Sequence, residues 1–164
     1  KTLSPEINME KEKQNWKALK GQYYYKENSF NFTIKGIGFY SNKEIIQKAC
    51  TIISRNLDNI SKKHGVTIQK SKKTVMENAY DIIIENHSYT IGNILKKIIY
   101  DNNYGKDVTY VGFIVEHPHD SFSILRIAYG TMVDEEYVMR TLGDACAQSI
   151  DYIQGLSTIF EQNI

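Results

Sequence analysis

The chain has 164 residues, of which 41% are hydrophobic and 24% are charged, with two prolines and ten glycines. This length predicts one domain of ~100–200 residues or two small units that share a core. The composition is that of a globular protein and excludes disorder, a collagen-like repeat and a coiled coil. The sequence holds no apolar run near the ~20 residues of a membrane span, so we expect no membrane contact.

The net charge of +1 hides a strong asymmetry between the two halves. Residues 1–75 hold 15 Lys and Arg against 6 Asp and Glu, whereas residues 76–164 hold 5 against 13. Opposite charges of this size favour packing of the halves on each other or on separate charged partners, although charge blocks are also common on solvated faces.

The first half predicts an arm, a strand, a helix and a linker. Residues 1–28 form a polar N-terminal arm to which the pattern assigns no element. Residues 29–35 alternate polar and apolar side chains with period two, which is typical of a half-buried strand. Ser41 and Glu44 form a capping box, which predicts a helix from there to about residue 63. Residues 66–79 lack an apolar period and predict a basic linker.

The second half, residues 80–164, predicts a strand at 80–85, a helix at 90–100, two strands at 108–115 and 122–129, and a terminal helix. Residues 116–120 join the two strands as a hairpin turn. Asp134 caps the last helix, which runs almost to Ile164 and should be about 45 Å long. This order predicts an α+β fold, with helices on one face of a mainly antiparallel sheet.

Two predicted helices carry apolar stripes that need a partner, and their charges are opposite. Residues 42–63 hold five basic and two acidic side chains, while residues 134–164 hold six acidic and one basic. We expect the two helices to pack on the sheet and on each other.

No catalytic set emerges from the remaining motifs. His117 and His119, with their flanking carboxylates, suit a zinc ion or a general base, but a turn stiffened by Pro118 is the favoured interpretation. Cys50 and Cys146 lie on apolar helix faces and predict small core residues. The lysines at 62–63 and 70–73 and the tyrosines at 23–25 could bind nucleic acid, which is the alternative function.

The stretch Tyr89-Thr90-Ile91-Gly92-Asn93-Ile94-Leu95 resembles the His-Thr-Leu-Gly-Asn-Leu-Leu motif of the small assembly subunits of multisubunit RNA polymerases, the L type and its alpha-like relatives. Val111-Gly112-Phe113 resembles the Ala-Gly-Tyr strand of that family, and His117-Pro118 resembles its His-Pro turn. Tyr89 stands where the family has histidine.

The first half carries a second resemblance. Residues 30–38 and the capped helix after them resemble the closing strand and helix of the larger D-type partner, with Lys35-Gly36 in place of Glu-Ser. The two likenesses together imply the fused D/L form of large DNA viruses. They assign residues 29–65 to a partial D-type dimerisation domain and residues 80–164 to an L-type one, and they imply that the rest of the D-type part lies before Lys1.

The resemblance implies a non-catalytic assembly platform of a DNA-dependent RNA polymerase, without a cofactor or a metal of its own. Its partners would be the two largest subunits and smaller ones, with DNA reached only through the complex; the isolated chain could also form a homodimer. The implied location is intracellular, in the nucleus, cytoplasm, viral replication site or virion. The implied partner-facing residues are Tyr89, Thr90, Ile91, Gly92, Asn93, Leu95, His117 and Pro118. The same resemblance implies that the two long helices pair through Ile46, Ile53, Leu57 and Ile60 on one, and Val138, Leu142, Ala145, Ile153, Leu156 and Phe160 on the other.

Overall fold

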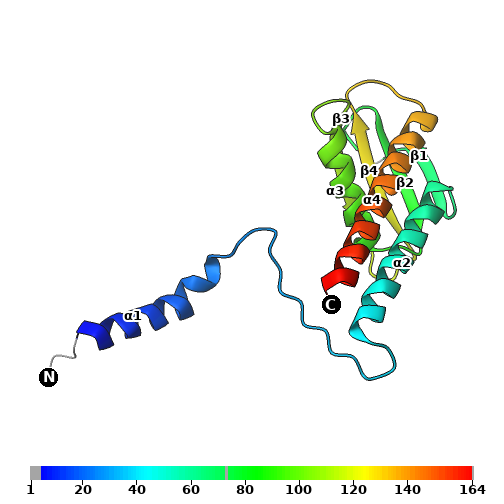
Figure 1. The fold of residues 1–164 in the computed structure, drawn as a ribbon. Helices are drawn as coiled ribbons and strands as arrows, with labels where there is room; N and C mark the ends of the chain where they lie inside the picture. Colours follow the sequence, from blue (N-terminus) through cyan, green and yellow to red (C-terminus); the bar gives the residue numbers. More distant parts are fainter. Residues whose placement is uncertain (1–4, 73, 164) are drawn as a thin grey trace. The chain divides into compact units, whose positions relative to one another are not determined.

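A computed structural model describes residues 5–72 and 74–163, with helices and strands labelled in Figure 1. Residues 1–4 of the predicted arm, Lys73 of the predicted linker and Ile164 lie outside the described residues. The chain divides into two compact units, residues 1–35 and 36–164. Within its described part, no helix has both the length and the apolar character that a membrane crossing demands.

The first unit contains a helix that the sequence pattern did not assign. Helix α1 spans Pro5–Leu19 and is followed by the short 3-10 helix η1, Gly21–Tyr23. The Trp16 ring stacks on the Tyr24 ring with centroids 5.6 Å apart. The strand predicted at 29–35 is wrong, because this segment has no regular structure and pairs with none of the strands in the described sheet. Its alternating aromatic residues Phe30 and Phe32 are 76% and 80% exposed.

The second unit begins with helix α2, Asn42–Ser61, which starts where the capping box predicts. The Glu44 amide donates to Ser41 Oγ at 3.2 Å, and the Ser41 amide donates to Glu44 Oε2 at 2.8 Å. The Ser41 amide, and the Ser41 hydroxyl that donates to Glu44 Oε2 at 2.9 Å, lower the pKa of the Glu44 carboxyl group. The cap therefore satisfies two amides of the first turn that lack a helical partner.

The sheet of this unit has the order β1-β2-β4-β3 with every neighbouring pair antiparallel. Its strands are β1 Val66–Lys70, β2 Ala79–Glu85, β3 Val108–Ile114 and β4 Phe122–Tyr129. The linker predicted at 66–79 is therefore wrong over its first five residues, which form the edge strand β1. Only Val66 and Ile68 of β1 turn toward the core, so the strand has too few apolar positions to show a period.

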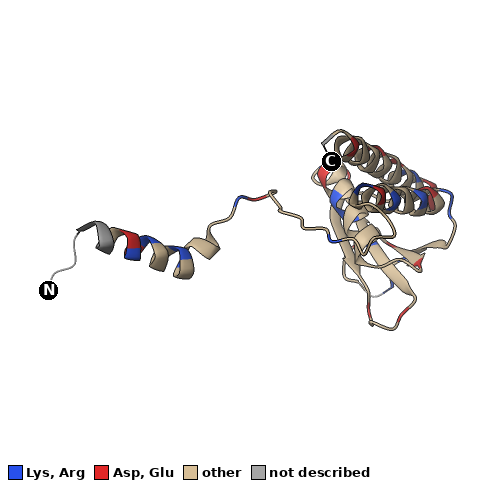
Figure 2. Cartoon of the chain, turned by 60° about the horizontal axis from the view of Figure 1, so that its bottom comes forward, with Lys and Arg blue, Asp and Glu red and all other residues tan. Residues whose placement is uncertain are grey.

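Helices α2, α3 (Tyr89–Asn103) and α4 (Glu135–Asn163) lie on one face of the sheet, as predicted (Figures 1 and 2). Asp134 caps α4, since its Oδ1 accepts from the Tyr137 amide at 2.8 Å. Side chains from the three helices and the inner face of the sheet form one buried core. Its fully buried large members include Leu57, Ile60, Ile82, Ile84, Leu95, Ile99, Leu125, Ile127 and Leu142.

Candidate assembly interface

Helices α2 and α4 lie side by side and run in opposite directions (Figure 1). Lys43, near the start of α2, donates from Nζ to the backbone carbonyl oxygen of Glu161, near the end of α4, at 2.6 Å. A cation is favourable at this position, because the carbonyl groups at a helix C-terminus carry partial negative charge. The basic and the acidic helix are thus brought together within one chain.

The residues expected in this helix pair fall into two groups along its length. Leu57, Ile60, Val138 and Leu142 are fully buried, and Ala145 is 3% exposed. Toward the other end of the pair the side chains are less buried. Leu156 is 46% exposed, and four others are half-buried: Ile46, Ile53, Ile153 and Phe160. The sheet-covered part of the pair is core, whereas the far part keeps apolar surface.

The two cysteines on these helices follow the same division. Cys146 of α4 is fully buried, and burial raises the pKa of its thiol to about 12. It therefore stays protonated at neutral pH and acts as a small packing group. Cys50 of α2 is only half-buried, so its predicted place in the core is wrong.

The start of α3 splits the predicted partner-facing residues. Tyr89, Thr90 and Asn93 are exposed, with Tyr89 at 53%. Ile91 and Leu95 are 4% and 0% exposed, and Gly92 is buried as well. Their assignment as partner-facing residues is wrong, because the helical repeat turns these three positions toward the sheet. These buried residues fix α3 on the sheet and so hold its exposed residues in position.

Gly92 is where α3 comes closest to the sheet. A Cβ added at Gly92 would lie 2.0 Å from Cε2 of the Phe113 ring on β3. The same ring meets Tyr89 edge to face, with centroids 5.7 Å apart. The glycine therefore lets the helix settle on Phe113, and Phe113 in turn orients the exposed Tyr89 ring.

His117 and Pro118 are exposed in the turn between β3 and β4. Asp120 closes this turn, accepting from the His117 amide at 3.0 Å while its own amide donates to the His117 carbonyl oxygen at 2.9 Å. The turn lies at the same end of the sheet as the start of α3, since the Asn86 amide donates to the Ser121 carbonyl oxygen. Among the residues described, no cluster of three or more His, Cys, Asp or Glu side chains is placed to hold a metal ion.

The outer face of the sheet holds an ion pair that the sequence analysis missed. Arg126 of β4 donates to Asp81 of β2 through Nε at 2.6 Å and through Nη2 at 3.0 Å. The Asp81 side chain is 8% exposed and that of Arg126 is 25% exposed. The hydrogen bonds to Asp81 raise the pKa of Arg126. The sequence does show one charged residue within each of these two apolar strands, which could have indicated an ion pair. Only the strand register shows that Asp81 and Arg126 are neighbours.

Replacing Asp81 by leucine is expected to lower the free energy of unfolding by about 2 kcal/mol, because a partly buried guanidinium loses its partner. This is less than the ~3–5 kcal/mol for breaking a fully buried pair. The double variant Asp81→Leu, Arg126→Leu should recover most of the loss, since it leaves no unpaired charge. Urea denaturation of the parent, Asp81→Leu, Arg126→Leu and the double variant measures the coupling between the two side chains. Additive effects of the two replacements would contradict it.

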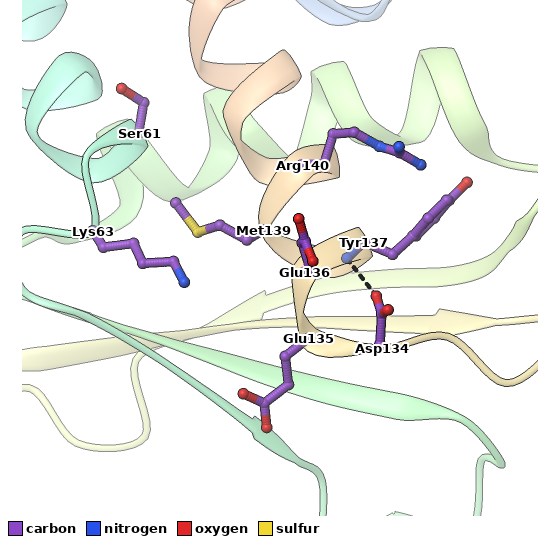
Figure 3. Close-up of a pocket in the computed structure, with 8 residues that line it drawn as sticks. All are labelled: Ser61, Lys63, Asp134, Glu135, Glu136, Tyr137, Met139 and Arg140. Carbon is purple, nitrogen blue, oxygen red and sulfur yellow. Dashed lines mark hydrogen bonds between the residues drawn. The ribbon is translucent and has the colours of Figure 1, made fainter.

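A hollow of about 810 Å³ lies where α2 ends and α4 begins (Figure 3). Lys63 faces this hollow from one side, and Asp134, Glu135 and Glu136 lie at the other. Acidic groups at a helix start stabilise the helix through its dipole, and Asp134 is already engaged as the cap. The acidic residues that line the hollow are therefore explained by their place at the start of α4.

Residues 79–158 match the family model described as the RNA polymerase Rpb3/Rpb11 dimerisation domain. The matched segment runs from β2 through α3, β3 and β4 into α4, and covers just under half of the chain. The fold of the second unit, with its antiparallel sheet and long last helix, is consistent with this dimerisation fold. This segment is therefore similar to the dimerisation domain of alpha-like RNA polymerase subunits. No curated protein matches the chain.

Proposed function

We propose that this chain is a non-catalytic assembly subunit of a DNA-dependent RNA polymerase, on which the two largest subunits and smaller ones come together. The observation that carries the proposal is the antiparallel α2–α4 pair on a sheet that matches the dimerisation domain. Its half-exposed end supplies apolar surface that a partner subunit would cover. The intracellular location expected from the resemblance is part of the same proposal.

We further propose that the chain is of the fused D/L type, as in large DNA viruses. Support comes from the position of α2, which precedes the family match and carries the D-type resemblance, yet packs on the L-type helix α4. Joining both helices in one chain makes their pairing intramolecular and raises the effective concentration of one for the other.

Co-expression with the two largest polymerase subunits of the same genome should give a complex that survives purification. Leu156→Asp should reduce the yield of this complex at least tenfold, because it puts a charge on the apolar end of the helix pair. Since Leu156 is 46% exposed, this variant should keep its fold, with stability within about 1 kcal/mol of the parent.

The matched control is Val75→Asp, which adds the same charge at a fully exposed position in the β1–β2 connection. It should assemble like the parent chain. Equal yields from Leu156→Asp and Val75→Asp would show that the helix pair is not part of the assembly surface. Failure of the parent chain itself to form a complex would refute the assembly function.

The second candidate is a nucleic-acid-binding module in the basic first half. It is favoured by one observation: Tyr23, Tyr24 and Tyr25 are 74%, 73% and 79% exposed within a lysine-rich unit. This function requires that the isolated protein bind DNA or RNA with a steep dependence on salt, because each phosphate contact releases counterions. The assembly function predicts weak, sequence-indifferent binding at most.

A further inference from the structure

The outer face of the sheet, opposite the three helices, carries a row of isoleucines that crosses the strands. Ile83 of β2 pairs with Ile124 of β4, and Ile124 pairs with Ile114 of β3. These positions alternate with core residues such as Ile82, Ile84 and Leu125, so their side chains point away from the helices. Ile83 and Ile124 are half-buried, and Ile114 is 51% exposed.

A polar row runs beside the isoleucines and bounds them. It consists of Asp81, Arg126 and Gly112, which are neighbours in the strand register. The Tyr110 side chain lies against Gly112, where an added Cβ would come within 2.3 Å of the tyrosine Oη. The isoleucine row is therefore bordered by a fixed ion pair and an aromatic ring.

Between these side chains the surface is hollowed. A depression of about 410 Å³ is lined by Tyr110, Ile114, Glu116, Ile124 and Arg126, among others. Arg126 is paired with Asp81 and also interacts electrostatically with Glu116, so these three groups together leave a net negative charge at the depression. Glu85, paired with Phe122 at the same end of the sheet, adds a second exposed carboxylate. The isoleucine row is thus apolar with an acidic border.

We propose that this outer face binds an apolar segment with flanking cationic side chains, supplied by a polypeptide that co-assembles with this chain. The apolar side chains of the segment lie along the isoleucine row, and its lysines or arginines face Glu116 and Glu85. The direction of the row, across the strands, suits a segment laid over the sheet rather than a strand added to its edge. The proposal rests on the assembly function and adds to it a second contact surface with defined chemistry.

Hydroxyl-radical footprinting of the complex with the two largest subunits tests this surface. Tyr110, which is 41% exposed, should be oxidised at least threefold more slowly in the complex than in the isolated chain, because the bound segment covers it. Ile114→Asp should raise the dissociation constant of the complex at least tenfold. Glu116→Lys should raise it about threefold and make it less sensitive to salt, since it removes the attraction for cations.

The matched control is Ile52→Asp, because Ile52 is 49% exposed on α2 and lies on the helix side of the sheet. It should leave the oxidation of Tyr110 in the complex unchanged. If the complex forms while Tyr110 keeps its free rate and Ile114→Asp binds like the parent, the outer-face proposal is wrong and the assembly function stands. If Glu116→Lys binds more tightly, the occupant is not cationic. If the parent forms no complex, the assembly function fails first.

Discussion

Leu142→Asp is expected to abolish the folded state of the second unit. Leu142 is fully buried in the core shared by α2, α4 and the sheet, so the aspartate would carry an unpaired charge into an apolar site. The cost should exceed ~4 kcal/mol, a large part of the ~5–15 kcal/mol that stabilises a typical domain. Circular dichroism and thermal unfolding should show loss of the cooperative transition.

The conservative variant Leu142→Met provides the control, because it keeps the volume and the apolar character of the side chain. It should cost less than ~1.5 kcal/mol. The comparison with Leu156→Asp is equally informative: the same change two heptads further along α4 should spare the fold and affect assembly. A cooperative transition of normal midpoint in Leu142→Asp would show that α4 does not pack as described.

Gly92→Ala is expected to destabilise the second unit by about 2–3 kcal/mol. Alanine favours a helix over glycine by ~1 kcal/mol, yet here its Cβ would overlap the Phe113 ring at 2.0 Å. Relief requires α3 to move away from β3 or the ring to leave its place, and overpacking of this kind costs ~1–3 kcal/mol or more. Urea denaturation measures the loss.

Gly155→Ala is the matched control, since it makes the same change in a helix with no atom within 4 Å of the added Cβ. It should raise the stability by up to ~1 kcal/mol. Adding Phe113→Leu to Gly92→Ala should restore part of the lost stability, because the smaller side chain frees space. A gain in stability from Gly92→Ala alone would show that the Phe113 ring does not pack against Gly92.

The helices of the second unit were the most predictable part of this fold, whereas α1 of the first unit was not predicted. The capping box at Ser41 and Glu44 located the start of α2, and the period of apolar residues set the course of α3 and α4. These signals are local, because a cap or a helical face is formed by residues within one or two turns. The α+β class and the single helical face of the sheet followed from the element order.

Strands were less predictable, because their pairing depends on distant residues. The clear alternation at 29–35 yields no strand, because alternating side chains define the two faces of a strand and do not decide whether its backbone joins a sheet. The weak pattern at 66–70 yields β1 because β2 offers its open edge. The Asp81–Arg126 pair and the contact of Gly92 with Phe113 each join segments that only the tertiary structure brings together.

The antiparallel arrangement of α2 and α4 also sets the order in which the protein can fold. Lys43 and Glu161 are hydrogen-bonded although 118 positions separate them along the chain. During synthesis the apolar stripe of α2 leaves the ribosome before the helix α4 that covers it. Contacts between such distant segments slow folding, and they lengthen the time for which aggregation-prone apolar surface is exposed. A nascent chain paused before α4 should therefore bind chaperones strongly and release them once α4 has been made.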